Sequence, residues 1–134
     1  MRTLELGTPG GIRAELNGLA LAGRKTATTG LFEDYAKEAE GLEYPGERLA
    51  LLDDAGREAG VVEITGVTVL PFAEVPWEHA EAEGEGDTSL AQWRANHRGY
   101  WQQLGSTVAD ATPVVCLTFR LVGDGSQPSS ATSA

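Results

Sequence analysis

Residues 47–72, ERLALLDDAGREAGVVEITGVTVLPF, decide the fold class of this 134-residue chain. Two apolar stretches flank the polar segment DDAG, and β-branched residues dominate the second stretch. β-Branched side chains favour strands, and a short polar segment with glycine between two such runs is typical of a hairpin. We therefore predict two adjacent strands in this stretch.

A further strand, mostly buried, is predicted in TPVVCLTFRLV, residues 112–122. The residues after Val122 read GDGSQPSSATSA and offer no side chains that could build a core. Such a segment buries too little apolar surface to offset the entropy of ordering. We therefore expect one domain over residues 1–122, followed by a disordered tail over residues 123–134.

Helical periodicity precedes the hairpin. Apolar residues within 12–20 recur at the spacing of one helix face. Thr8 followed by proline is typical of a helix cap and first turn, and Gly23 can end the helix because glycine accepts left-handed backbone. The sequence LFEDYAKEAEG, residues 31–41, repeats apolar residues every four positions, which predicts a second, shorter helix.

An aromatic region, residues 75–105, separates the hairpin from the last strand. Pro76 is expected to start a short helix. Asp87 or Thr88 can cap the next one, and Ser89 with Gln92 has the spacing of a capping box. The region therefore adds helices between strands without regular βαβ alternation. This pattern favours an α+β fold with a small, mainly antiparallel sheet or barrel.

Charge limits the possible partners. The chain has 20 acidic and 10 basic residues, a net charge of −10. Proteins that coat DNA or RNA through phosphates need a basic face, so we expect no binding to long DNA. Any contact with nucleic acid should be small and local, such as one nucleoside, one nucleotide or a short part of an RNA in a pocket.

The sequence also indicates a compartment. The lone Cys116 cannot build an intramolecular disulfide framework and is expected to be a buried small hydrophobe. The N-terminus has no apolar signal-peptide core, and no apolar run approaches the roughly 20 residues of a membrane span. We therefore predict a cytoplasmic protein without a membrane partner, and the oligomeric state stays open.

The stretch GRKTAT, residues 23–28, places Lys25 and Thr28 three residues apart, so both side chains can point the same way in a helical turn or tight loop. A threonine hydroxyl is a poor nucleophile unless a neighbour takes its proton. A lysine does so only when its amine is partly neutral, which requires desolvation. The same pattern is also typical of a solvated helix end.

The stretch HAEAEGEGD, residues 79–87, alternates carboxylates with glycines. Oxygen donors of this kind can bind a hard metal ion, or they can favour the positive end of the following helix. Neither calcium-loop nor zinc-ligand spacing occurs, so we assign no metal ligand and expect no cofactor, while metal binding by these carboxylates stays open as an alternative. The glycines allow a close backbone approach or unusual backbone angles.

The stretch WRANHRGYW, residues 93–101, combines aromatic rings with Arg94 and Arg98, one helical turn apart. Such a set can grip a base and a phosphate. Aromatic residues at helical spacing are also common in cores, and His97 lies on the apolar stripe of the predicted helix.

Taken together, these stretches resemble the ASCH domain family. The resemblance rests on the G-x-K-x-x-T element, the strand pair, the pattern EGEGD-x-SL-x-x-W and the closing PVVCLTFRLV, in this order over about residues 10–122. The chain is most similar to a bacterial subfamily with the EGEGD signature. The resemblance implies a β-barrel like that of the PUA RNA-binding domain, with flanking helices and a cleft lined by G-x-K-x-x-T.

One bacterial branch of the family hydrolyses the acetyl amide of N4-acetylcytidine with a lysine, a threonine and a glutamate. The matching residues here are Lys25, Thr28 and Glu83. The resemblance implies that threonine attacks the carbonyl, lysine takes its proton and glutamate assists. A carboxylate beside the lysine favours the ammonium, so the alternative is that Glu83 is the base and charged Lys25 stabilises the oxyanion.

Three functions therefore stay open. The first is a small hydrolase of a modified nucleoside or nucleotide, the second is a non-catalytic module that binds RNA or a nucleotide, and the third is a metal-assisted ribonuclease that uses the EGEGD carboxylates. Another bacterial ASCH protein is a ribonuclease, so the resemblance does not fix the reaction. The acidic charge favours a small substrate. Secondary candidates for substrate binding are Arg24, Arg94 and His97.

Overall fold

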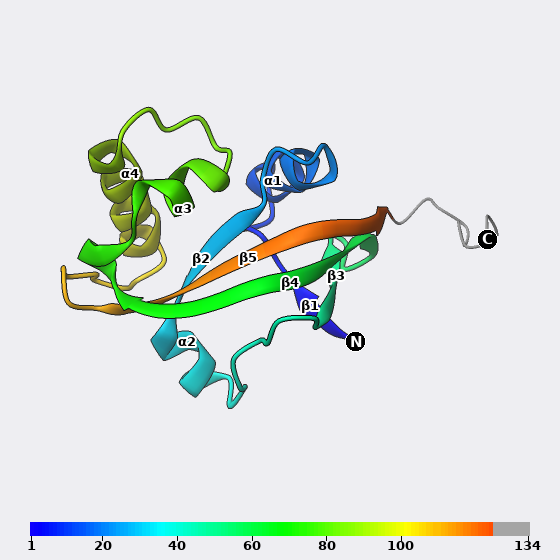
Figure 1. The fold of residues 1–134 in the computed structure, drawn as a ribbon, viewed down its shortest axis with the longest axis horizontal. Coiled ribbons are helices and arrows are strands. Elements are labelled where there is room, and N and C mark those ends of the chain that lie inside the picture. Colours follow the sequence, from blue (N-terminus) through cyan, green and yellow to red (C-terminus); the bar gives the residue numbers. More distant parts are fainter. Residues whose placement is uncertain (125–134) are drawn as a thin grey trace.

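The computed structural model describes residues 1–124, whose strands form one mixed sheet in the order β1-β3-β4-β5-β2 (Figure 1). The strands are β1 Arg2–Leu4, β2 Ala27–Leu31, β3 Arg48–Leu52, β4 Glu58–Pro71 and β5 Pro113–Asp124. β1 runs parallel to β3, and the other neighbouring pairs are antiparallel. The α+β class with a mainly antiparallel sheet is confirmed, and the barrel-like sheet is open between its edge strands β1 and β2.

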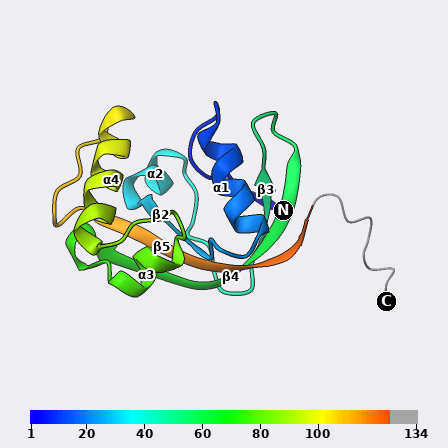
Figure 2. The ribbon, with the colours of Figure 1, turned by 90° about the horizontal axis from the view of Figure 1, so that it is seen from above.

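Helices pack around the sheet. They are α1 Ile12–Leu21, α2 Phe32–Lys37, α3 Trp77–Ala82 and α4 Leu90–Gln103, with a short 3₁₀ turn at Phe72–Glu74. In Figure 1, α1, α3 and α4 lie above the sheet and α2 lies below it. Viewed from above, α1 and α4 are separated along the sheet (Figure 2). Within residues 1–124, none of the helices combines the length and apolar character that a membrane crossing requires.

The predicted hairpin is confirmed as β3 and β4. Leu49 pairs with Val62, and Ile64 pairs with Phe119 of β5. The residues Val62, Ile64 and Phe119 are buried, so β4 contributes apolar side chains from the centre of the sheet. Bulges shift the register near Leu51 and after Ile64, and such bulges increase strand twist and bending.

Two apolar clusters fill the core. The first packs beneath α1 and consists of Leu4, Leu6, Ala20, Leu49, Leu51, Val62, Ile64, Val115, Leu117 and Phe119. The second packs beneath α3 and α4 and consists of Leu31, Phe72, Val75, Ala80, Trp93, Trp101, Val108, Val114 and Cys116. Cys116 is a buried free thiol, as the sequence predicts. One sheet thus supports two cores, and a site between α1 and α4 lies at their junction.

Glycines with positive φ angles precede and follow α1. The predicted start at residues 8–9 is wrong, because Gly10 and Gly11 have φ values of 104° and 115°, and the helix begins only at Ile12. The predicted end is confirmed, since Gly23 follows the helix with φ 78°. Helical φ is negative, so the two left-handed glycines delay the start, whereas the third ends the last turn.

Other predicted ends agree with the structure. Pro76 is the N-cap of α3. The Oγ of Ser89 accepts a hydrogen bond from the Gln92 amide at 3.1 Å, so Ser89 is the N-cap of α4, and Asp87 and Thr88 are not. The helix predicted over residues 31–41 is shorter and is preceded by β2. The sequence analysis did not predict β1 or β2, which have three and five residues and no clear alternation.

The predicted boundary at Val122 differs slightly from the structure. β5 continues to Asp124, so Gly123 and Asp124 belong to the sheet. The rest of the predicted tail, residues 125–134, lies outside the described residues.

The connection after α3 docks on the segment between α1 and β2. The Thr26 amide donates to the Ala82 carbonyl at 2.8 Å. Gly84 has φ +67°, and a Cβ on it would lie 2.3 Å from the Arg24 carbonyl oxygen. Only glycine accepts both the left-handed angle and this close approach. The docking brings Lys25 next to the carboxylates that follow α3.

Gly84→Ala is therefore expected to destabilise the fold by about 2–4 kcal/mol, since left-handed strain and a backbone clash add. Gly86→Ala is the matched control, because Gly86 also has a positive φ of +93° but open space around its Cβ position. It should cost only about 1–2 kcal/mol. Urea denaturation measures both values, and equal losses in the two variants would contradict the proposed close approach.

Candidate functional site

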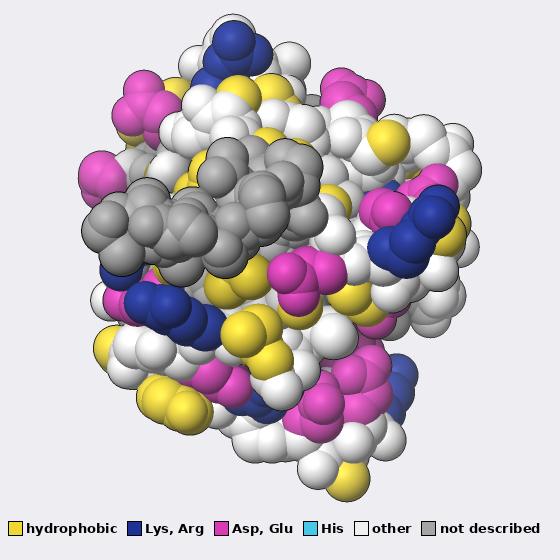
Figure 3. Space-filling model, turned by 90° about the vertical axis from the view of Figure 1, so that its right-hand side faces the viewer, with side chains coloured by type: hydrophobic (Ala, Val, Ile, Leu, Met, Phe, Trp, Pro, Cys, Tyr) yellow, Lys and Arg dark blue, Asp and Glu magenta, His cyan; other side chains and the backbone are white. Residues whose placement is uncertain are grey.

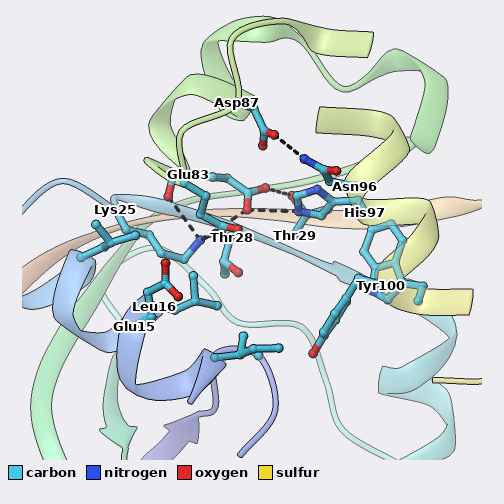
Figure 4. Close-up of a pocket in the computed structure, with 15 residues that line it drawn as sticks. Glu15, Leu16, Lys25, Thr28, Thr29, Glu83, Asp87, Asn96, His97 and Tyr100 are labelled. Atoms are coloured by element: carbon cyan, nitrogen blue, oxygen red, sulfur yellow. Dashed lines mark hydrogen bonds and ion pairs between the residues drawn. The ribbon is translucent and has the colours of Figure 1, made fainter. Parts of the chain in front are cut away.

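A pocket of about 270 Å³ lies between α1, the start of β2 and the α3–α4 region (Figure 4). Its apolar lining comes mainly from α1 and α4: Ile12, Leu16, Leu19, Tyr100 and Trp101. Its polar lining consists of Glu15, Lys25, Thr28, Thr29, Glu83, Glu85, Asp87, Asn96 and His97. An enclosed site with one apolar side and convergent polar groups is the usual form of a small-molecule site.

Lys25 is the buried cation of this pocket, with only 1% of its side chain exposed. Its Nζ lies 3.3 Å from Oε1 of Glu83 and 2.6 Å from Oε2 of Glu85. A buried ammonium requires such partners because it has lost its hydration. The cationic residue after α1 therefore lies inside the molecule, at the wall of the pocket.

Glu83 is the buried anion that organises the site. Its Oε2 accepts hydrogen bonds from the Thr29 hydroxyl at 2.6 Å and the Trp93 indole N–H at 3.2 Å. Its Oε1 lies 3.4 Å from Nε2 of His97, in addition to the contact with Lys25. Both oxygens are thus engaged by groups from β2, α4 and the segment before β2. This set of donors fixes the orientation of the carboxylate.

His79 extends the network on α3. Its Nε2 lies 2.8 Å from Oγ1 of Thr29 and 3.6 Å from Oε2 of Glu83. Because the Thr29 hydroxyl donates to Glu83, it accepts from His79. Burial opposes a charge on His79, but contacts with Cys116 and Glu83 outweigh it and raise the pKa of His79 to about 9.

His97 is also held in its charged form. Its Nδ1 lies 2.9 Å from the Trp93 carbonyl oxygen, while Nε2 faces Glu83. Both ring nitrogens therefore face acceptors. Burial lowers the pKa of His97, yet the hydrogen bond and charge of Glu83 raise it further, so the net shift is upward. The ring stacks on Trp93 with centroids 4.1 Å apart.

The two glutamates that contact Lys25 have pKa values shifted in opposite directions. Burial works against the Glu83 anion, but hydrogen bonds from His79 and His97 and the charge of Lys25 hold the pKa of Glu83 well below its ordinary value. Loss of hydration raises the pKa of Glu85, and the negative charge of Glu83 adds to this rise, while Lys25 opposes it. The site thus contains one fixed anion and one carboxylate that protonates more easily.

The structure brings Lys25 and Glu83 together across more than fifty residues of chain. Thr28 lines the same pocket, but within residues 1–124 its hydroxyl makes no hydrogen bond to either of them. The hydroxyl bonded to Glu83 belongs to its neighbour Thr29. Both Thr28 and Thr29 of the edge strand β2 contribute to the pocket lining.

Of the three secondary candidates for substrate binding, one lines the pocket and two do not. His97 lines the pocket. The Arg24 side chain is exposed and lies outside the pocket lining. Arg94 is also outside the lining, and its Nη2 donates to the Ala73 carbonyl at 2.7 Å. Arg94 therefore stabilises the segment before α3.

Three site residues, His79, Thr29 and Glu85, were not assigned from the sequence. His79 and Glu83 lie four residues apart, which places them on one face of α3, and this spacing could have indicated a pair. Thr29 could not be assigned, because the strand that positions it was not predicted. Nothing in the sequence distinguishes Glu85 as the residue nearest to the Lys25 amine.

The carboxylates of the EGEGD segment point to different partners. Glu83 and Glu85 contact Lys25, whereas Asp87 accepts from the Asn96 amide at 2.7 Å. Among the described residues, no group of three or more His, Cys, Asp or Glu side chains is arranged to hold a metal ion. This part of the chain therefore supplies no donor set for the metal-assisted ribonuclease hypothesis.

The charged form of His79 predicts a pH dependence of stability. The folded protein keeps this proton up to about pH 9, whereas an unperturbed histidine loses it near 6.5. The stabilisation is complete below the lower value and is lost as the pH rises through the upper one. We expect the free energy of unfolding, measured in urea, to fall by about 2–3 kcal/mol across this window. His79→Gln should lose this part of the dependence, and an unchanged dependence in that variant would contradict the assignment.

Several solved structures resemble most of this chain. Protein EF3133 from Enterococcus faecalis has a TM-score of 0.83 at 23% identity, and the match covers 99% of this chain and 83% of that one. An ASCH domain from Lactobacillus crispatus has a TM-score of 0.72 at 28% identity, covering 83% and 72%. A mutant of ZmASCH from Zymomonas mobilis has a TM-score of 0.51 at 14% identity, covering 80% and 63%, which supports the fold alone.

Family membership follows from the sequence comparison. None of the curated proteins matches this chain. The model of the ASCH domain family matches residues 6–123, which include β2, β3, β4, all of β5 except Asp124, the four α-helices of the described residues and the pocket lining. With its PUA-like α+β fold and its ASCH structural neighbours, the chain belongs to the ASCH domain family.

Proposed function

We propose that this ASCH domain is a small hydrolase that cleaves an amide on a modified nucleoside, of the N4-acetylcytidine type. One observation carries the proposal: the dry Lys25–Glu83 ion pair, 3.3 Å between Nζ and Oε1, opens on a pocket that Thr28 also lines. These are the three residues at which the chain matches the amidohydrolase branch of the family. An ion pair with 1% and 2% exposure has a high desolvation cost, which its geometry and the further hydrogen bonds to Glu83 must offset.

The walls of the pocket suit a nucleobase. The partly exposed Tyr100 offers an aromatic surface on which a base can stack, and Asn96 offers an amide that can read a base edge. The leucines of α1 form an apolar wall opposite α4. A planar ligand with polar edges therefore matches the lining better than an extended strand.

The proposed reaction uses water and three side chains. The Thr28 oxygen attacks the amide carbonyl carbon while the Lys25 amine takes the hydroxyl proton. Lys25 then returns the proton to the leaving amino group as the C–N bond breaks. Water hydrolyses the acyl-threonine ester and releases the carboxylic acid. Glu83 orients Lys25 throughout, because its own oxygens are fixed by other donors.

The charge of the pocket favours an uncharged substrate. Four carboxylates face two cationic groups in its lining: Glu15, Glu83, Glu85 and Asp87 against Lys25 and His97. Both cations already contact carboxylates. A phosphate would therefore meet net repulsion. This charge pattern favours a nucleoside over a nucleotide, and it argues against a long RNA.

We expect the protein to release cytidine from N4-acetylcytidine, and liquid chromatography measures this release. Lys25→Ala and Thr28→Val should each lower kcat by about 10²–10⁴-fold, since one removes the proton acceptor and the other the nucleophile. Thr28→Val keeps the size and β-branching of the side chain, so the fold should persist.

Wild-type protein that shows no turnover above Lys25→Ala would contradict the proposed reaction. Saturable binding of a labelled RNA at low and moderate salt, without cleavage, would then favour the non-catalytic module. RNA cleavage that is lost on adding a chelator would favour the ribonuclease.

Substrate charge provides a second test. N4-acetylcytidine should have a kcat/KM at least about tenfold higher than its 5′-monophosphate at low ionic strength, and added salt should narrow the difference. Both are assayed with the same chromatographic method. Preference for the monophosphate would mean that a phosphate subsite exists outside the acidic lining, which contradicts the charge argument.

A further inference from the structure

Two glutamates contact the Lys25 ammonium, but their surroundings differ. Glu83 has 2% of its side chain exposed, and both of its oxygens receive contacts from β2, α3 and α4. A carboxylate that accepts several hydrogen bonds stays ionised. Glu83 is therefore a fixed anion and a poor acceptor for the Lys25 proton.

Glu85 has a simpler environment. Its side chain is 26% exposed and borders the pocket. Among residues 1–124, the polar contact of its carboxylate is with Nζ of Lys25, at 2.6 Å from Oε2. This contact is shorter than the 3.3 Å between Lys25 and Glu83. Glu85 thus has the shortest path for a proton to leave the ammonium, and it has one oxygen free of such contacts.

The electrostatic surroundings separate the two carboxylates further. The charged groups around Glu85 in the pocket are Lys25, Glu83, His97, Glu15 and Asp87. Loss of hydration and the nearby Glu83 anion raise the pKa of Glu85, while the pKa of Glu83 is lowered. When the surroundings shift the pKa values of two neighbouring groups in opposite directions, the roles of acid, base and fixed charge can be assigned.

We propose that Glu85 is the carboxylate that accepts the proton of Lys25 and so makes the amine available to Thr28. The inference rests on the proposed hydrolase function and deepens it. Glu85 is a positioning residue in this scheme, because it acts through Lys25 and not on the substrate. The family resemblance assigns the glutamate role to Glu83 and gives Glu85 none.

The proton transfer is balanced. One proton moves from Nζ of Lys25 to Oε2 of Glu85, which converts the ion pair into an amine and a carboxylic acid with no change in total charge. The free electron pair of the amine then takes the Thr28 hydroxyl proton. At the same time the Thr28 oxygen bonds to the carbonyl carbon, and the carbonyl π electrons move to its oxygen. The scheme explains how a lysine between two carboxylates can act as a base.

The experiment measures the pH dependence of kcat on N4-acetylcytidine in wild type and Glu85→Gln. Wild-type kcat should fall as the pH drops through the raised pKa of Glu85, because protonated Glu85 accepts no further proton. Glu85→Gln should lower kcat at neutral pH by about 10²-fold with little change in KM. The fall of kcat that wild type shows on the acidic side should be absent from this variant, because glutamine does not titrate. A variant that keeps the wild-type kcat and pH profile would overturn the proposal.

The matched control is Glu81→Gln, which removes the same charge from an exposed residue of the same region, outside the pocket lining. It should keep the wild-type profile. Urea denaturation of both variants checks that the fold is intact.

A titration that needs no substrate separates failure of this inference from failure of the proposed function. Carbon-13 shifts of the glutamate side-chain carboxyls are followed against pH in wild type and are assigned with Glu85→Gln and Glu81→Gln. Glu85 should titrate above the ordinary glutamate value of 4.5, while Glu83 stays ionised well below it. A Glu85 that titrates at or below the ordinary value overturns the proton assignment, even if the protein hydrolyses the amide. If the protein hydrolyses nothing, the hydrolase proposal fails, and this titration alone decides the assignment.

Discussion

The buried carboxylate of Glu83 is the interaction on which the site depends. A carboxylate removed from water is stable only with hydrogen-bond donors and positive charge around it. Here the donors come from segments far apart in sequence: Lys25 and Thr29 at β2, His79 on α3, and Trp93 and His97 on α4. One charge therefore ties two helices to the edge strand, and the pocket forms where they meet.

Backbone docking makes this convergence possible. The sheet carries two separate apolar clusters, one under α1 and one under α3 and α4. By contrast, acidic and basic side chains are dispersed over the outer face shown in Figure 3. The connection after α3 reaches the segment before β2 through the Thr26 amide and the close approach at Gly84. Polar contacts thus join the two cores at the pocket, where apolar packing alone would leave a gap between the helices.

The same arrangement explains how a lysine between carboxylates can take part in proton transfer. Glu83 is saturated with donors and serves as an anchor, whereas Glu85 meets the ammonium at 2.6 Å and remains partly hydrated. A site with two identical carboxylates would only hold the proton on lysine. Unequal surroundings permit one carboxylate to orient the amine and the other to exchange its proton, which is the usual way that neighbouring groups acquire different roles.

Periodicity and turn chemistry in the sequence determined the hairpin, the long last strand, the helix end at Gly23 and the Ser89 cap, because these depend on local preferences. The resemblance to ASCH domains pointed to Lys25, Thr28 and Glu83. Only the tertiary structure decided that β2 is an edge strand, that Thr29 and His79 hold Glu83, that Glu85 is nearest to the amine, and that Arg24 and Arg94 lie outside the pocket. Local sequence sets backbone preferences over a few residues, whereas the partners of the buried Glu83 charge depend on how separate elements pack, and two of them, Lys25 and Thr29, lie more than fifty residues away.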